Sequence, residues 1–174
     1  MGNFYTNFTV FGASSEEVLA VTRELRRTAY VMQSVAGASV LFDSVSDEQD
    51  VDEIERLGAL LSGRLGSPVL ACLNHDDDHL LLWVFREEKK EGFYQSCIDA
   101  PRFAWALARI RGGMLSYPFI VAVLGWPIVL FAHLRHSALA SLLSLPKIAV
   151  GYGYNSLSRG EIPIGHSKDE IHRA

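Results

Sequence analysis

The sequence predicts an α+β protein that folds as a single domain, and three observations lead to this prediction. Strand-like and helix-like apolar patterns succeed one another along residues 1–100. The composition, with 49% hydrophobic and 21% charged residues, is that of a packed chain and not of a disordered one. At 174 residues the chain can bury a full core without disulfides or metals, and no long linker divides it.

The first three elements follow from residue periodicity. Residues 4–11 alternate between two faces, which is typical of a half-buried strand. Ser14 and Glu17 have the spacing of a capping box, so we expect a helix to begin there, with apolar residues recurring every three or four positions. Residues 30–35 and 39–42 are β-prone runs joined by a short connection, and this predicts a hairpin.

A second helix and further strands complete residues 1–100. An apolar stripe over residues 51–65, ending near Gly66, predicts the helix. Residues 69–73 and 80–85 are apolar runs on either side of a polar cluster, which predicts another hairpin, and a strand is expected near 92–97. The order of elements is that of a ferredoxin-like split β-α-β core with two additional strands.

Residues 101–160 are predicted to form a helical, apolar extension that ends in a strand over 147–154, followed by a polar tail at 161–174. No Asp, Glu, Lys or Arg occurs from Gly112 to Leu134, a length that meets the threshold for a membrane span. Pro118 and Pro127 argue against a span, because each deletes a helix hydrogen bond that lipid cannot replace. We expect buried core here, with membrane association of Met114 to Leu134 as the alternative.

Charge and cysteine content restrict the cellular context. Sixteen basic and twenty acidic residues give a net charge of -4, which disfavours nucleic acid as a partner. Cys72 and Cys97 show no metal-ligand or disulfide pattern, and the N-terminus lacks the features of a secretory signal. These observations predict a cytoplasmic location. They predict neither a cofactor nor a particular oligomeric state.

The strongest candidate site is the polar cluster between residues 74 and 80. Its imidazoles and carboxylates could share a transition metal or Zn²⁺ if the chain turned them inward. Aspartates are also what an exposed hairpin tip requires, because their side chains bond their own backbone. We expect a solvated turn. The candidate residues are His75, Asp76, Asp77, Asp78 and His79.

Three weaker candidate sites occur elsewhere in the sequence. Gly151 and Gly153 form a Gly-x-Gly without the third glycine of a nucleotide loop, and we interpret them as allowing a bulge or close backbone contact. His133 and His136 have a helical spacing found among metal ligands. The C-terminal tail carries several residues of the types that bind metals. We expect the chain end to be frayed, so that these side chains do not come together at a metal site. They are Glu161, His166, Asp169, Glu170 and His172. No nucleophile elbow, Walker loop or His-Glu-x-x-His helix occurs.

Three motifs resemble those of a family of small bacterial proteins without an assigned activity. They are Gly-Asn-Phe-Tyr-Thr-Asn at residues 2–7, Asn-His-Asp-Asp-Asp at 74–78, and Ala-Val-Gly-x-Gly-Tyr at 149–154. The apolar residues 114–131 look unlike the more polar helix expected of such proteins. The resemblance implies one bacterial, intracellular domain and no catalytic residues.

The function predicted from these features is a non-catalytic protein-interaction module of immunity or regulatory type. A compact acidic domain without catalytic spacing can present a complementary face to a partner with a basic surface. Asp76, Asp77 and Asp78 are the expected binding residues. The alternative is a metal-assisted hydrolase, in which His75, Asp76, Asp78 and His79 hold a cation that lowers the pKa of a bound water.

Overall fold

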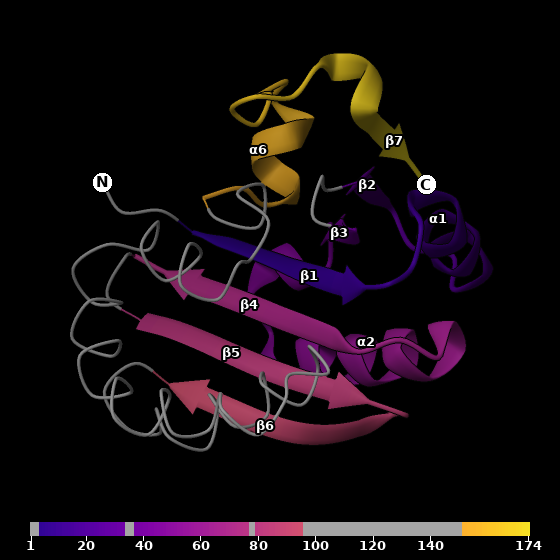
Figure 1. The fold of residues 1–174 in the computed structure, drawn as a ribbon. Coiled ribbons are helices and arrows are strands. Elements are labelled where there is room, and N and C mark those ends of the chain that lie inside the picture. Colours follow the sequence, from indigo (N-terminus) through magenta and orange to yellow (C-terminus); the bar gives the residue numbers. More distant parts are fainter. Residues whose placement is uncertain (1–3, 34–36, 77–78, 96–150) are drawn as a thin grey trace, which may run out of the picture.

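The computed structural model describes residues 4–33, 37–76, 79–95 and 151–174. Within them it is a mixed α+β fold, in which helices pack on a seven-stranded antiparallel sheet (Figure 1). The elements along the chain are β1 (Tyr5–Phe11), α1 (Ser15–Glu24), β2 (Ala29–Gln33), β3 (Ala38–Asp43), the 3-10 helix η1 (Ser46–Glu48), α2 (Val51–Leu65), β4 (Val69–His75), β5 (His79–Arg86), β6 (Lys89–Gln95), α6 (Tyr154–Ser158), the 3-10 helix η3 (Lys168–Glu170) and β7 (Ile171–Arg173).

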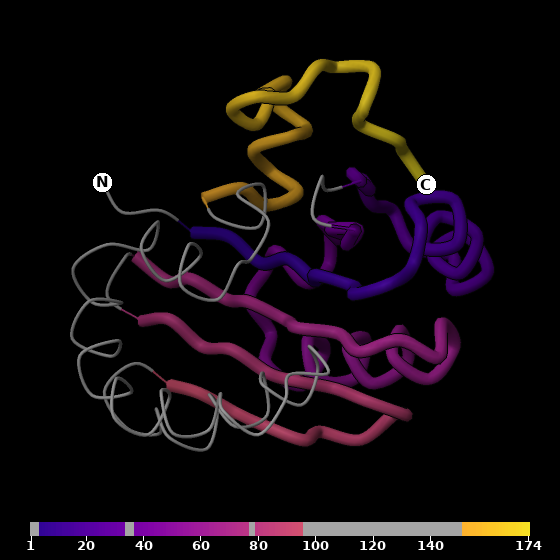
Figure 2. Tube along the Cα trace, viewed as in Figure 1, coloured from indigo at the N-terminus to yellow at the C-terminus, as the bar shows by residue number. Residues whose placement is uncertain are grey.

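The strand order is β6-β5-β4-β1-β3-β2-β7, and every neighbouring pair is antiparallel. Helices α1 and α2 pack on one face of the sheet, in a core that includes Phe8, Leu57 and Trp83. On the other face Leu157 of α6 packs against a second cluster that contains Met32 and Phe42. Figure 2 shows residues 151–174 returning from the far end of the sequence to lie beside the first three strands.

Strand β1 is buried on both faces, so the prediction of a half-buried strand is wrong. Its alternate residues Asn7 and Thr9, expected at the surface, are as buried as Phe8. The reason is tertiary: β1 lies between β3 and β4, and the chain end packs over it, where Asn7 Nδ2 donates to the Tyr152 carbonyl over 3.1 Å. Alternation in the sequence shows that two faces differ but not that one is solvated.

Both α-helices in residues 4–76 begin with a side-chain cap, of which only the first was predicted from the sequence. Ser14 and Glu17 form the predicted capping box, in which the Ser14 side chain accepts from the Glu17 amide and the Glu17 carboxylate accepts from the Ser14 amide. Helix α2 begins after Asp50, whose carboxylate accepts from the Asp52 amide over 3.0 Å. It ends at Gly66 in a left-handed conformation with φ of 57°, which confirms the predicted end.

The predicted hairpins are confirmed as antiparallel pairs. β2 pairs with β3, and β4 pairs with β5 in a register that places His75 opposite His79. A third hairpin joins β5 to β6 through Glu87 and Glu88, which both have positive φ, at 49° and 64°. The Glu88 amide donates to Ser62 Oγ over 3.0 Å, which ties this turn to α2.

The described part of the chain end differs from its prediction. A strand is expected over residues 147–154, but residues 151–153 are not a strand and Tyr154 begins the helix α6. The residues expected to form only a polar tail contain η3 and β7, and β7 extends the sheet by pairing with β2. Polar composition concealed this strand because two of its three side chains, His172 and Arg173, face solvent.

Several predictions fall outside the described residues. They are residues 101–150 of the predicted helical extension with their charge-free stretch at 112–134, Cys97, and the pair His133 and His136. Among the residues that are described, no helix has the length and apolar character needed to cross a membrane.

Candidate functional site

The polar cluster of the sequence lies at the tip of the β4–β5 hairpin. His75 ends β4 and His79 begins β5, and both are exposed. Asp76 is exposed and has a left-handed φ of 56°, a conformation that aspartate tolerates better than most residues. Asp77 and Asp78 lie outside the described residues. Within the described part of the chain, no three His, Cys, Asp or Glu side chains gather as metal ligands would.

Gln49 joins the loop before α2 to this hairpin. Its Nε2 donates to the Asn74 carbonyl over 2.7 Å, and its Oε1 lies 2.6 Å from His75 Nδ1. Gln49 has a left-handed φ of 65°, a backbone conformation that costs free energy in a residue other than glycine. The two side-chain contacts of Gln49 help to stabilise this conformation. On the other side of His75, the Phe4 ring packs edge-on at 4.8 Å between ring centroids.

The contacts of Gln49 place acidic side chains from two separate stretches at one end of the sheet. Glu48, Asp50 and Asp52 flank Gln49, while Asp76 follows His75, and all four are exposed. No ion pair joins any of them to another described residue. Exposed apolar side chains lie among them: Phe4 is 53% exposed, Val45 44% and Val51 40%. We call these seven residues the acidic surface.

Some acidic residues elsewhere in the described fold form ion pairs, whereas Glu16, Glu87 and Asp169 are exposed and form none with another described residue. Glu24 pairs with Arg64, Glu55 with Lys90, and Glu161 with Arg159. The negative charge of the acidic surface therefore projects into solvent, whereas these other carboxylates are neutralised locally.

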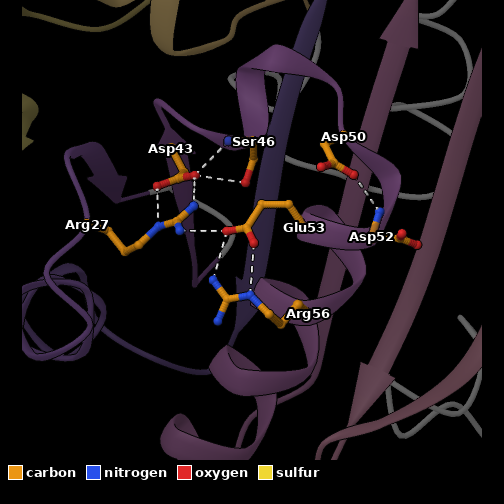
Figure 3. Close-up of polar contacts among 7 residues, drawn as sticks. All are labelled: Arg27, Asp43, Ser46, Asp50, Asp52, Glu53 and Arg56. Carbon is orange, nitrogen blue, oxygen red and sulfur yellow. Dashed lines mark hydrogen bonds and ion pairs between the residues drawn. The ribbon is translucent and has the colours of Figure 1, made fainter.

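A buried charge network fixes the loop that carries the acidic surface. Figure 3 shows Arg27 between Asp43, at the end of β3, and Glu53, on α2. Asp43 is fully buried and also accepts from the amide and the hydroxyl of Ser46, each over 2.8 Å. Asp43 thus ties η1 to the sheet, and Arg27 ties Asp43 to α2.

The charges of this network reinforce one another. Burial by itself would lower the pKa of Arg27, but the carboxylates of Asp43 and Glu53 raise it above its ordinary value. Hydrogen bonds from Arg56, then those from Arg27, lower the pKa of Glu53. Both shifts favour the charged forms of Arg27 and Glu53, and each of these side chains is paired, which favours a structural role over a catalytic one.

A second buried carboxylate, Asp47, holds the C-terminal residues. Its Oδ1 accepts from the Thr6 amide over 3.0 Å, and its Oδ2 accepts from the Asn155 amide over 2.9 Å. Gly153 makes this approach possible, because a Cβ built there would lie 2.3 Å from Asp47 Oδ1. The interpretation of the Gly-x-Gly as a site of close backbone contact is confirmed.

Asp47 is a residue that the sequence analysis missed. It lies in a run of acidic residues, and nothing in that run distinguishes the buried carboxylate from its solvated neighbours. Burial raises its pKa, although backbone hydrogen bonds from Asn155, Thr6 and Tyr154 oppose the shift.

The remaining candidates do not converge on a site. In the tail, His166 pairs with Glu170, with 2.5 Å between Nδ1 and Oε2, and this contact lowers the pKa of Glu170. His172 lies on β7, which pairs with β2, so the expectation of a frayed end is wrong. Cys72 is a buried free thiol whose pKa burial raises to about 12, so it is unreactive in the native fold.

No protein-family model, curated protein or solved structure matches this chain.

Proposed function

We propose that the chain is a protein-interaction module whose acidic surface binds a partner with a basic surface. The observation that carries this proposal is that the contacts of Gln49 with Asn74 and His75 join two acidic stretches of the chain. Their carboxylates, on Glu48, Asp50, Asp52 and Asp76, are all exposed and form no ion pair within the described residues. Such charge steers a partner of opposite sign and raises its association rate.

The apolar members of the acidic surface supply the remaining part of an interface. Interfaces combine a desolvated apolar centre with a polar rim, and aromatic side chains often contribute most of the binding energy. Phe4 is such a side chain, since it is exposed and positioned by its contact with His75. We infer that Phe4 governs the dissociation rate and the carboxylates govern the association rate.

The test begins with a partner co-purified from the native host. The triple variant Asp76→Asn, Asp77→Asn, Asp78→Asn removes charge at the hairpin tip, and asparagine also tolerates the left-handed conformation at position 76. Association rates measured by surface plasmon resonance should fall at low ionic strength, and the difference from wild type should shrink as salt screens the charges.

A matched control removes the same charge elsewhere. Glu16, Glu87 and Asp169 are exposed and lie outside the acidic surface, so their triple change to Gln, Gln and Asn should leave the association rate near that of wild type. The variant Glu48→Gln, Asp50→Asn, Asp52→Asn removes the other three carboxylates of the acidic surface and should also slow association. Unchanged rates for both this variant and the Asp76–78 variant, or an equal loss in the control, would exclude the acidic surface as the binding site. The Asp76–78 variant and the control should melt close to wild type, because solvated charges contribute little to stability.

The second candidate function is the metal-assisted hydrolase. The observation that favours it is the register of β4 and β5, which places the exposed His75 and His79 opposite each other. Elemental analysis of the purified chain tests it: stoichiometric Zn²⁺ or Mn²⁺ that disappears in a His75→Ala, His79→Ala variant supports the hydrolase. Metal that persists in the variant, or none at all, argues for the interaction module.

For the fold, we propose that the elements from β1 to β4 are a ferredoxin-like split β-α-β unit. The strand order β4-β1-β3-β2, with α1 and α2 on one face, supports this assignment. Cross-strand NOEs between β1 and both of its neighbours would test it.

A further inference from the structure

Residues 151–174 are held to the sheet at both ends. The contacts at the start are side-chain hydrogen bonds and a buried leucine, and those at the end are the short strand β7, a hydrogen bond from Arg23 to the Arg173 carbonyl and the packing of Ala174 against the core. At the start, Asp47 accepts from the Asn155 amide, Asn7 donates to the Tyr152 carbonyl, and Leu157 is buried. At the end, β7 has three residues, of which Ile171 is half-buried and the other two are exposed. Because the anchoring contacts of the start lie at residues 152–157, β7 can separate from the sheet without disturbing them.

Strand β7 covers the outer backbone edge of β2. The Ala174 amide donates to the Ala29 carbonyl over 2.9 Å, and β7 pairs with β2 in a register that places Val31 opposite His172. Backbone groups alternate sides along a strand, so Val31 presents its N–H and C=O to β7 as Ala29 does. Removal of β7 would leave these groups as an open strand edge.

If β7 separates, the outermost strands of the described sheet are β6 and β2, and these two edges differ. The β6 edge carries Lys89 and Lys90, and its pairing with β5 is irregular at Val84 and Phe85; charges and bulges of this kind discourage a further strand. Strand β2, with the sequence Ala-Tyr-Val-Met-Gln, contains no charged residue. Of the two edges, that of β2 is the one suited to accept a strand.

We propose that the outer edge of β2 is a peptide-binding site, which accepts an extended segment of a partner protein by β-strand addition and is occupied by β7 in the free chain. Main-chain hydrogen bonds supply affinity in this mode of recognition, and alternate side chains supply specificity. The site shares no residue with the acidic surface, so it goes beyond the function proposed above.

Strand β7 indicates the chemistry of the segment that this edge binds. Ile171 packs with the Met32 cluster on the α6 face of the sheet. Two residues later, the Arg173 guanidinium lies 6.0 Å from the centroid of the Tyr30 ring, a cation–π distance. A partner segment should therefore carry an apolar residue followed, two positions on, by a basic one.

A labelled peptide with the sequence of residues 168–174 tests the site in the full-length chain. Ile171→Asp removes the apolar contact of β7, so this variant should bind the peptide at least tenfold more tightly than wild type, in which the covalently attached strand competes at high effective concentration. Ile164→Asp is the matched control, because Ile164 lies in the same segment but is 86% exposed. It should bind as weakly as wild type.

Fluorescence anisotropy measures the binding. A peptide with proline in place of its histidine should not bind, because the backbone amide at that position faces Val31 of β2 and proline cannot donate this hydrogen bond. Three results would each overturn the proposal: no binding by a folded Ile171→Asp variant, equal binding of the proline peptide, or a stable dimer of the variant that excludes the peptide. The last result would mean that the edge accepts a second copy of the chain.

Hydrogen exchange in the wild-type chain gives an independent test if Ile171→Asp fails to fold. Opening of β7 alone should expose the Val31 amide, which should exchange at least a hundredfold faster than the amides in the centre of β1. If the Val31 amide exchanges only by global unfolding, β7 does not leave the edge and the proposal is wrong.

Discussion

Replacement of Asp47 by alanine is expected to loosen residues 151–174 from the sheet. The carboxylate bridges two distant parts of the chain, because Oδ1 accepts from Thr6 in β1 while Oδ2 accepts from Asn155 in α6. Alanine removes both acceptors at once. The Thr6 amide is the more affected, since its hydrogen bond is buried.

The magnitude follows from the two amides that lose their partner. A buried donor left unsatisfied costs about 1 to 3 kcal/mol. Thr6 incurs this cost in full, whereas the partly buried Asn155 amide can bind water once α6 loosens. We therefore expect the free energy of unfolding to fall by about 2 to 4 kcal/mol. Gly153→Ala should act in the same direction, because its Cβ would lie 2.3 Å from Asp47 Oδ1 and displace the carboxylate.

Two assays test whether Asp47→Ala lowers the free energy of unfolding and loosens residues 151–174. Urea unfolding measures the free energy, and limited trypsin digestion measures access to Arg159 and Lys168 within the loosened segment. Asp169→Ala is the control, because Asp169 is exposed in that segment and its loss should change stability by less than about 0.5 kcal/mol. If Asp47→Ala unfolds at the wild-type midpoint and its C-terminal residues are cleaved no faster, the carboxylate does not anchor the segment.

Three further predictions concern other buried or strained positions. Arg27→Ala should lower the free energy of unfolding by about 3 to 5 kcal/mol in urea titrations, because Asp43 is fully buried and loses its charged partner. Glu88→Gly should raise it by about 1 kcal/mol, because it relieves a left-handed residue at φ of 64°. The difference in free energy of unfolding between wild type and Asp47→Ala should become smaller as pH rises from 3.8 through the raised pKa of Asp47. The reason is that the Asp47 carboxyl binds its proton more tightly in the native state than in the unfolded state. Urea unfolding of both proteins across this pH window measures the difference. An unchanged midpoint in the first two cases, or a constant difference in the third, contradicts the respective argument.

The local structure of residues 4–95 could be predicted because it depends on neighbours in the sequence. The capping box of Ser14 and Glu17 and the end of α2 at Gly66 use interactions within a few residues, which a sequence displays directly. The same applies to the β4–β5 hairpin, where apolar runs flank a polar turn. The location of Asp76 at an exposed tip, and hence part of the acidic surface, follows from that pattern.

Only the tertiary structure decided which charged residues are buried and what lies at each edge of the sheet. Asp43 and Asp47 occur in the same acidic run as the exposed Asp50, and they differ because Arg27 and the amides of Thr6 and Asn155 reach them from distant parts of the chain. Likewise, Ile171, His172 and Arg173 form a strand because β2 offers them an open edge. Burial and strand pairing depend on partners far away in the sequence, so the pattern of a short segment determines its local conformation but not its place in the fold.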